Sequence, residues 1–162
     1  MTTHPQKVAR FTLIVKKFKD IFTTPIGNRG TLYRMTMDKP HHPLVEATED
    51  KNGYVKKIKI GPGRVTLRFQ IAPEENNQYR PVGIAFVRKV KRRKNKLMIG
   101  PVLKNFPPNK MNLDAKNCAV SVTADFSSSG GDGKAKFEFF LIIQRDKPGD
   151  LGIIDPPLDH EH

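Results

Sequence analysis

The segment Arg64-Val-Thr-Leu-Arg-Phe-Gln-Ile71 decides the fold, because its apolar and polar residues alternate from end to end. In an extended strand, successive residues fall on opposite faces. One face therefore carries the apolar residues Val65, Leu67, Phe69 and Ile71, and the other carries Arg64, Thr66, Arg68 and Gln70. This period predicts a β-strand with one face against a core and the other in water.

The same alternation recurs on both sides of this segment. We expect further strands over residues 10–16, 31–37, 54–60, 82–89, 96–103, 118–126 and 134–144. Clusters of Gly, Pro, Asn and Asp separate them, as turns require. The last two strands are expected to pair as a hairpin with residues 127–133 at its tip. A short final strand over residues 151–154 is expected to end at Asp155-Pro156, because proline cannot donate to the ladder.

Helices are not expected, because 12 Gly and 13 Pro interrupt nearly every window of sufficient length. Only residues 16–22 are compatible with a helical turn. Without helices between the strands, the crossovers of a parallel sheet are not expected either. We therefore predict an all-β chain: an antiparallel β-sandwich of the immunoglobulin-like or Greek-key type with about eight strands, in preference to a closed barrel. It forms a single domain over residues 1–162, with a short flexible N-terminus and an acidic C-terminal tail.

The hydropathy and cysteine content indicate a cytoplasmic protein with no membrane partner. No apolar run approaches the roughly 18–20 residues of a membrane helix, and residues 1–19 lack the pattern of a secretory signal. Cys118 is the single cysteine, so an internal disulfide is excluded, which agrees with a reducing compartment. Its position in phase with Val120 and Val122 predicts a core residue rather than a reactive thiol.

The charge is concentrated in the middle of the chain. The net charge is +13, but residues 51–110 hold sixteen basic residues against Glu74 and Glu75, a balance of +14. Within that region the basic ribbon, residues 88–96, holds seven cations, which are Arg88, Lys89, Lys91, Arg92, Arg93, Lys94 and Lys96. Such a run is compatible with sequence-independent binding of nucleic acid or another polyanion. The alternative is a solvated hairpin whose charge keeps a sheet edge from pairing with neighbours.

Self-association is the leading functional interpretation of the remaining sequence. Residues 145–162 hold five carboxylates against Arg145 and Lys147, so this acidic tail is able to pair with the basic middle of a second copy. The strand over residues 134–144 becomes apolar on both faces toward its end. We therefore expect Phe140 and Ile142 to lie at the interface of a homo-oligomer. The predicted function is that of a non-enzymatic binding or assembly module.

No pattern points to catalysis, a cofactor or a metal. The loop over residues 127–133 lacks the Lys-Ser/Thr pair and the following helix of a phosphate-binding loop. His41 and His42 are adjacent and so point to opposite faces of a strand, and the histidines of the tail lie near the chain end. We accordingly expect no enzyme activity, no cofactor and no metal site.

The C-terminal quarter resembles a small family of bacterial proteins called the DP-EP family. The resemblance rests on the Gly- and Ser-rich segment over residues 127–133, the apolar strand over residues 134–144, and Gly149-Asp-Leu-Gly-Ile-Ile-Asp-Pro156. Pro157 and Leu158 follow where a second acidic pattern would be expected, so the chain departs from the family at that point. The resemblance implies an all-β sandwich of bacterial origin, and it supplies no activity or site residue.

Overall fold

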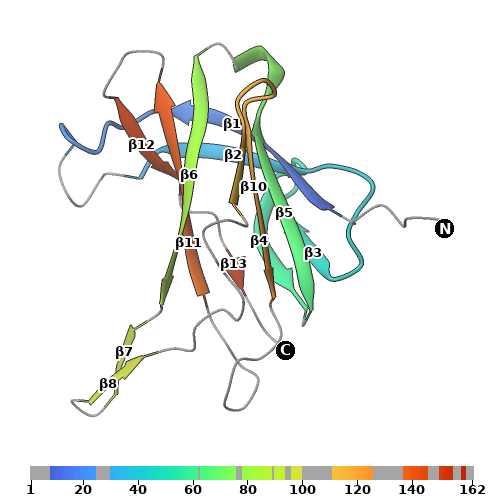
Figure 1. The fold of residues 1–162 in the computed structure, drawn as a ribbon, viewed down its shortest axis with the longest axis vertical. Helices are drawn as coiled ribbons and strands as arrows, with labels where there is room; N and C mark the ends of the chain where they lie inside the picture. Colours follow the sequence, from blue (N-terminus) through green and yellow to red (C-terminus); the bar gives the residue numbers. More distant parts are fainter. Residues whose placement is uncertain are drawn as a thin grey trace.

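The computed structural model of the chain describes residues 8–24, 30–61, 63–75, 78–88, 90–93, 96–99, 111–125, 137–145, 150–154 and 158–159 (Figure 1). These residues form β-strands, turns and one turn of 3-10 helix at Pro73–Glu75. The prediction of an all-β chain is confirmed. The expected N-terminal flexibility, the loop over residues 127–133 and the end of the acidic tail lie outside the described residues.

The largest sheet has five strands in the order β2-β1-β5-β10-β9. The strands are β1 (Val8–Lys17), β2 (Leu32–Met37), β5 (Arg64–Ile71), β9 (Met111–Asp114) and β10 (Ala119–Asp125). The strand that decided the prediction, β5, lies at its centre, where Phe69 pairs with Phe11 of β1 and Val120 of β10. The sheet is open, with β2 and β9 at its edges.

Two three-stranded sheets and a two-stranded ribbon complete the described part. One sheet has the order β12-β11-β6, formed by β12 (Leu151–Ile154), β11 (Phe137–Arg145) and β6 (Tyr79–Arg88). The other has the order β13-β4-β3, formed by β13 (Leu158–Asp159), β4 (Val55–Ile60) and β3 (Val45–Glu49). The ribbon consists of β7 (Val90–Arg93) and β8 (Lys96–Ile99).

A single cluster of buried apolar side chains joins the three larger sheets. Phe11, Leu67 and Phe69 come from the five-stranded sheet, Leu141 from β11 and Ile58 from β4. The rings of Phe11 and Phe69 stack with their centroids 5.2 Å apart. Along β5 every second residue is buried, so the alternation that predicted the strand also fills the core.

Two details of strand pairing differ from the prediction. The pairing is not purely antiparallel, because β1 runs parallel to β5 and β13 runs parallel to β4. The parallel pairing of β1 with β5 is reached because β2, β3 and β4 lie between them in sequence and return the chain in the same direction. The expected hairpin is wrong: β10 pairs with β5 and β9, whereas β11 pairs with β12 and β6 in another sheet.

Three local predictions are corrected as well. Residues 16–22 form no helical turn; β1 continues to Lys17, and a turn follows. Strands β3 and β9 were not predicted. Cys118 is half-buried rather than at the heart of the core, because it sits in the turn before β10 with a φ of 48°, outside the strand alternation.

Candidate anion-binding surfaces

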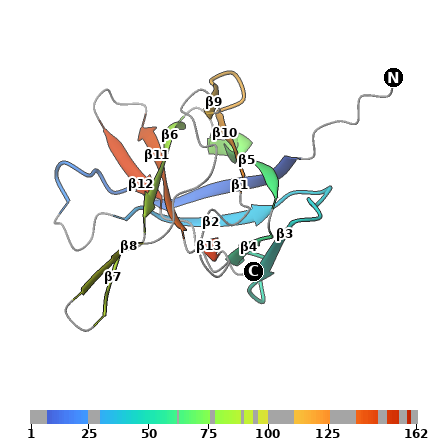
Figure 2. The ribbon, with the colours of Figure 1, turned by 60° about the horizontal axis from the view of Figure 1, so that its bottom comes forward.

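The basic run predicted from the sequence forms the end of β6 and the separate β7–β8 ribbon. Arg88 ends β6, while Lys91, Arg92 and Arg93 belong to β7 and Lys96 begins β8. Lys89 and Lys94 lie outside the described residues. Figures 1 and 2 show the ribbon extending away from the larger sheets, from the end of β6. Four described cations of the run, Lys91, Arg92, Arg93 and Lys96, therefore lie on this projecting ribbon, and Arg88 lies on the strand that leads to it.

The pairing within the ribbon brings basic positions together. Arg93 pairs with Lys96, and Lys91 pairs with Met98 on the rung two residues away. Positions directly opposite each other, and positions two apart along a strand, share a face of the pleat. Lys91, Arg93 and Lys96 thus occupy positions on one face of the ribbon. A two-stranded β-ribbon is also narrow enough to enter the major groove of duplex DNA.

The residues expected at an oligomer interface lie on β11, the middle strand of its sheet. Ile142 is half-buried, whereas its neighbours Leu141 and Ile143 are fully buried, so it lies on the face turned away from the core. Ile142 pairs with Ile153 of β12, which is also half-buried, and with Gly83 of β6. Phe140 pairs with Ala85 on the same two strands, and its side chain is not among those that the structure describes. On the outer face the described neighbours Ile142 and Ile153 are both apolar.

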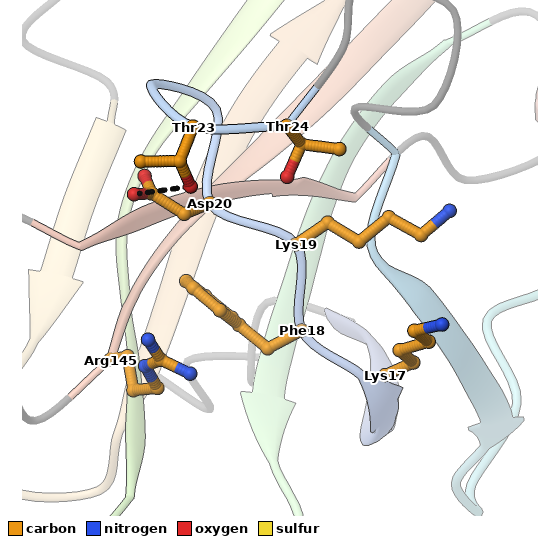
Figure 3. Close-up of a pocket in the computed structure, with 7 residues that line it drawn as sticks. All are labelled: Lys17, Phe18, Lys19, Asp20, Thr23, Thr24 and Arg145. Atoms are coloured by element: carbon orange, nitrogen blue, oxygen red, sulfur yellow. Dashed lines mark hydrogen bonds between the residues drawn. The ribbon is translucent and has the colours of Figure 1, made fainter.

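A second basic surface, which was not predicted, surrounds a cavity of about 580 Å³ at the end of β1. Its lining consists of residues 17–20 together with Thr23, Thr24 and Arg145 (Figure 3). Lys17 ends β1, the turn follows it, and Arg145 ends β11. In Figure 3 Lys17 and Lys19 extend to one side of the Phe18 ring and Arg145 lies on the other. Cationic residues from two sheets therefore line one hollow.

The turn beside this cavity, residues 18–24, is fixed by hydrogen bonds at both ends. Lys19 N donates to Thr31 Oγ1 at 3.1 Å, and Ile21 N donates to the Leu151 carbonyl at 2.9 Å. The carboxylate of Asp20 accepts from Phe22 N and from Thr23 Oγ1, each at 3.2 Å. Aspartate commonly organises a turn by accepting from the backbone two residues ahead. The turn is therefore tied to β12 and held by its own carboxylate.

Arg145 is held in place from two directions. Its Nε and Nη2 donate to Asp150 Oδ2 at 3.0 and 2.6 Å. Its guanidinium carbon lies 4.7 Å from the centroid of the Phe18 ring, and that ring stacks on Tyr79 at 5.7 Å. Contacts of this kind between a cation and an aromatic ring are attractive. The guanidinium is thus presented to the cavity in a fixed orientation.

The balance of charges around the cavity favours an anion. Lys17, Lys19 and Arg145 supply three positive charges, and Asp20 and Asp150 supply two negative ones, which leaves a balance of +1. Within the described part of the chain, neither Lys17 nor Lys19 makes an ion pair, whereas both carboxylates are engaged. Free ammonium groups beside engaged carboxylates can bind a phosphate or a carboxylate group.

The sequence held only half of the signal for this surface. Lys16-Lys-Phe-Lys19 is a visible basic cluster, but it was assigned to a helical turn. Arg145 lies 126 residues after Lys19, and only the pairing of β11 with β12 brings it to the same place. Phe22, in the turn, is 68% exposed.

A polar network on the outer face of the five-stranded sheet lowers the pKa of one carboxyl group. The side chain of Asn117 donates to Asp114 at 2.8 Å, and Arg68 Nη2 pairs with the same carboxylate at 3.1 Å. These hydrogen bonds, that of Asn117 first, hold the pKa of Asp114 below its ordinary value. Arg68 Nε is buried without a hydrogen-bond partner in the described part.

The described residues include neither a candidate metal site nor a helix able to span a membrane. No three His, Cys, Asp or Glu side chains in that part gather where they would hold a metal ion. None of its segments is a helix with the length and apolarity needed to cross a bilayer.

The fold and these surfaces define the class: an all-β protein that carries a projecting basic ribbon and a second basic surface at the end of β1. No protein-family model and no curated protein matches the chain.

Proposed function

We propose that this protein is a non-enzymatic, cytoplasmic binding module that holds nucleic acid or another polyanion through the β7–β8 ribbon, without sequence preference. The observation that carries the proposal is that Lys91, Arg92, Arg93 and Lys96 of the basic run belong to a separate ribbon outside the three larger sheets (Figure 1). A ribbon that only protected a sheet edge would be expected to lie along that edge. The β7–β8 ribbon pairs with no other described strand.

The rest of the fold supports this role as a rigid base. We infer that the five-stranded sheet and the two three-stranded sheets pack as the layers of a β-sandwich, of immunoglobulin-like type, around the shared apolar cluster. Binding surfaces commonly lie on loops and hairpins that such a scaffold holds in position. Lysine and arginine on the ribbon gain free energy when they displace counterions from phosphates, whatever the base sequence.

The test is a salt titration of binding to labelled duplex DNA. The ribbon variant replaces Lys91, Arg92, Arg93 and Lys94 by Gln. The matched control replaces four exposed lysines elsewhere by Gln, so that the net charge falls equally; these are Lys39, Lys51, Lys56 and Lys116. We expect the ribbon variant alone to bind weakly, with a salt slope smaller by about 0.9 for each lost phosphate contact. Equal losses in both variants, or no salt-sensitive binding by the wild type, would refute the proposal.

Self-association is a second candidate, which the outer face of β12-β11-β6 favours. Ile142 and Ile153 are half-buried and adjacent on that face. An apolar sheet face of this kind is commonly covered in an oligomer. If the protein is a dimer in light scattering, Ile142→Asp should make it a monomer, while Thr48→Asp on exposed β3 should not. A wild-type monomer at high concentration would remove this candidate.

A further inference from the structure

We propose that the cavity at the end of β1 is a binding site for one nucleotide unit of single-stranded nucleic acid, with its phosphate beside Lys17 and Lys19 and its base stacked on Phe22. This site is separate from the β7–β8 ribbon and does not depend on it. It also selects a different form of nucleic acid, because the bases of a duplex stack on each other and offer no free face.

The phosphate half of the site rests on the two lysines. In Figure 3 their side chains extend in the same direction from the end of β1 and the start of the turn. Neither makes an ion pair in the described part of the chain, so neither has to give up a partner when a phosphate binds. Lysine binds phosphate as a point charge, and Arg145 adds a third cation across the Phe18 ring.

The base half of the site rests on Phe22. Its side chain is 68% exposed, the highest value among the large apolar residues of the described part. It precedes Thr23, which lines the cavity, and adjacent Cα atoms lie about 3.8 Å apart. Phe22 therefore lies on the same turn as Lys19, three positions after it. Single-strand binding proteins combine these two elements, a cationic groove and an exposed aromatic ring on which a base stacks.

The turn holds this aromatic ring in place before any ligand arrives. Phe22 N donates to Asp20 Oδ1, and the preceding residue Ile21 donates to Leu151 on β12. A preformed platform loses less conformational entropy on binding than a mobile one. Leu32, 53% exposed, pairs with Lys17 and adds apolar surface at the same end of the sheet. The cavity is thus lined by three cations and Asp20, and two exposed apolar side chains lie on the adjoining turn and strand.

The test compares a labelled ten-residue oligothymidylate with a base-free polyphosphate of equal length. Phe22→Ala should weaken oligothymidylate binding by about 5- to 150-fold, as loss of one stacked base predicts, and leave polyphosphate binding unchanged. The double change Lys17→Gln and Lys19→Gln should weaken both ligands and lower the salt slope by about 0.7 for each lost phosphate contact. Leu113→Ala, exposed on β9, is the matched control and should change neither.

Each measurement is repeated with the ribbon variant as the starting protein, so that the two proposals fail separately. If the ribbon variant loses duplex binding while its oligothymidylate binding still depends on Phe22, both proposals are supported, because the ribbon and the cavity then act independently. The nucleotide site is overturned if Phe22→Ala binds oligothymidylate as tightly as the wild type, or weakens polyphosphate equally. Because Phe22 is exposed, the variant should fold, which its circular dichroism spectrum checks.

Discussion

Replacing Gly152 by alanine tests how firmly Phe18, which lines the cavity, is packed. Gly152 lies on β12, and a Cβ atom there would stand 2.8 Å from Phe18 Cε2 and 2.8 Å from Thr31 Oγ1. Neither neighbour can move at no cost. The Phe18 ring lies between Arg145 and Tyr79, and the Thr31 hydroxyl, on a residue only 4% exposed, accepts from Lys19 N.

The expected loss of stability follows from these contacts. Inserting a methyl group into a packed site costs about 1–3 kcal/mol, because its neighbours leave their preferred positions. Replacing a strand glycine by alanine returns about 0.5–1 kcal/mol, since the unfolded chain then has less conformational freedom to lose. The net destabilisation of Gly152→Ala is therefore about 1–2 kcal/mol. For a domain of this size it lowers Tm by about 2–8 °C.

Urea unfolding and thermal melting, followed by circular dichroism, measure this loss. Gly83→Ala is the matched control, because a Cβ atom at Gly83 would meet only Ile142 Cδ1 at an ordinary contact distance of 3.8 Å. We expect that variant to be as stable as the wild type or slightly more so. If Gly152→Ala is equally stable, Phe18 and Thr31 are not held as described, and the preformed cavity is refuted.

Two more predictions concern the core and the acid limit of stability. Phe69→Ala should lower the free energy of unfolding by about 3–5 kcal/mol in urea titration, because it leaves a cavity at the centre of the core. Phe22→Ala should change that free energy by no more than about 0.5 kcal/mol, because Phe22 is exposed. Equal effects would contradict the burial pattern. Because the pKa of Asp114 is lowered from 3.8, its charged form stabilises the fold above that pH, and this contribution is lost as the pH falls through the lowered value. Asp114→Asn should therefore flatten the fall in stability below pH 3.8. A fall as steep as that of the wild type would assign the acid sensitivity to other groups.

The sequence was sufficient to predict a strand where the alternation of apolar and polar residues lies within that strand. The alternation in Arg64–Ile71 comes from burial of one face, and that face is buried in the structure. Strand β3 was missed because Val45-Glu-Ala-Thr-Glu49 has one large apolar residue and so shows no clear period. The hairpin of β10 with β11 was wrong because pairing partners depend on packing between distant segments. The apolar alternation of Val120 and Val122 fits β5 as well as it would fit a neighbour in sequence.

The same distinction separates the two basic surfaces. The ribbon was located because its cations lie close together in the sequence, so they stay close together whatever the fold. The cavity was not located from the sequence, because its lining combines a turn after β1 with Arg145 at the end of β11, which is far away in the chain. The exposure of Phe22 was not predicted from the sequence, for a related reason. An inward position follows from the period of a strand, and Phe22 lies in a turn, where no period applies.

The parallel pairing of β1 with β5 also sets an order of events during protein synthesis. Val8 pairs with Thr66, which follows it by 58 positions, so β1 leaves the ribosome long before that partner exists. At about 5–20 residues per second the delay is roughly 3–12 s. During it, only β2 is available to pair with β1, and the apolar face of Phe11 and Leu13 has no second layer to cover it. The nascent chain is therefore most open to chaperones, and to aggregation, before β5 emerges.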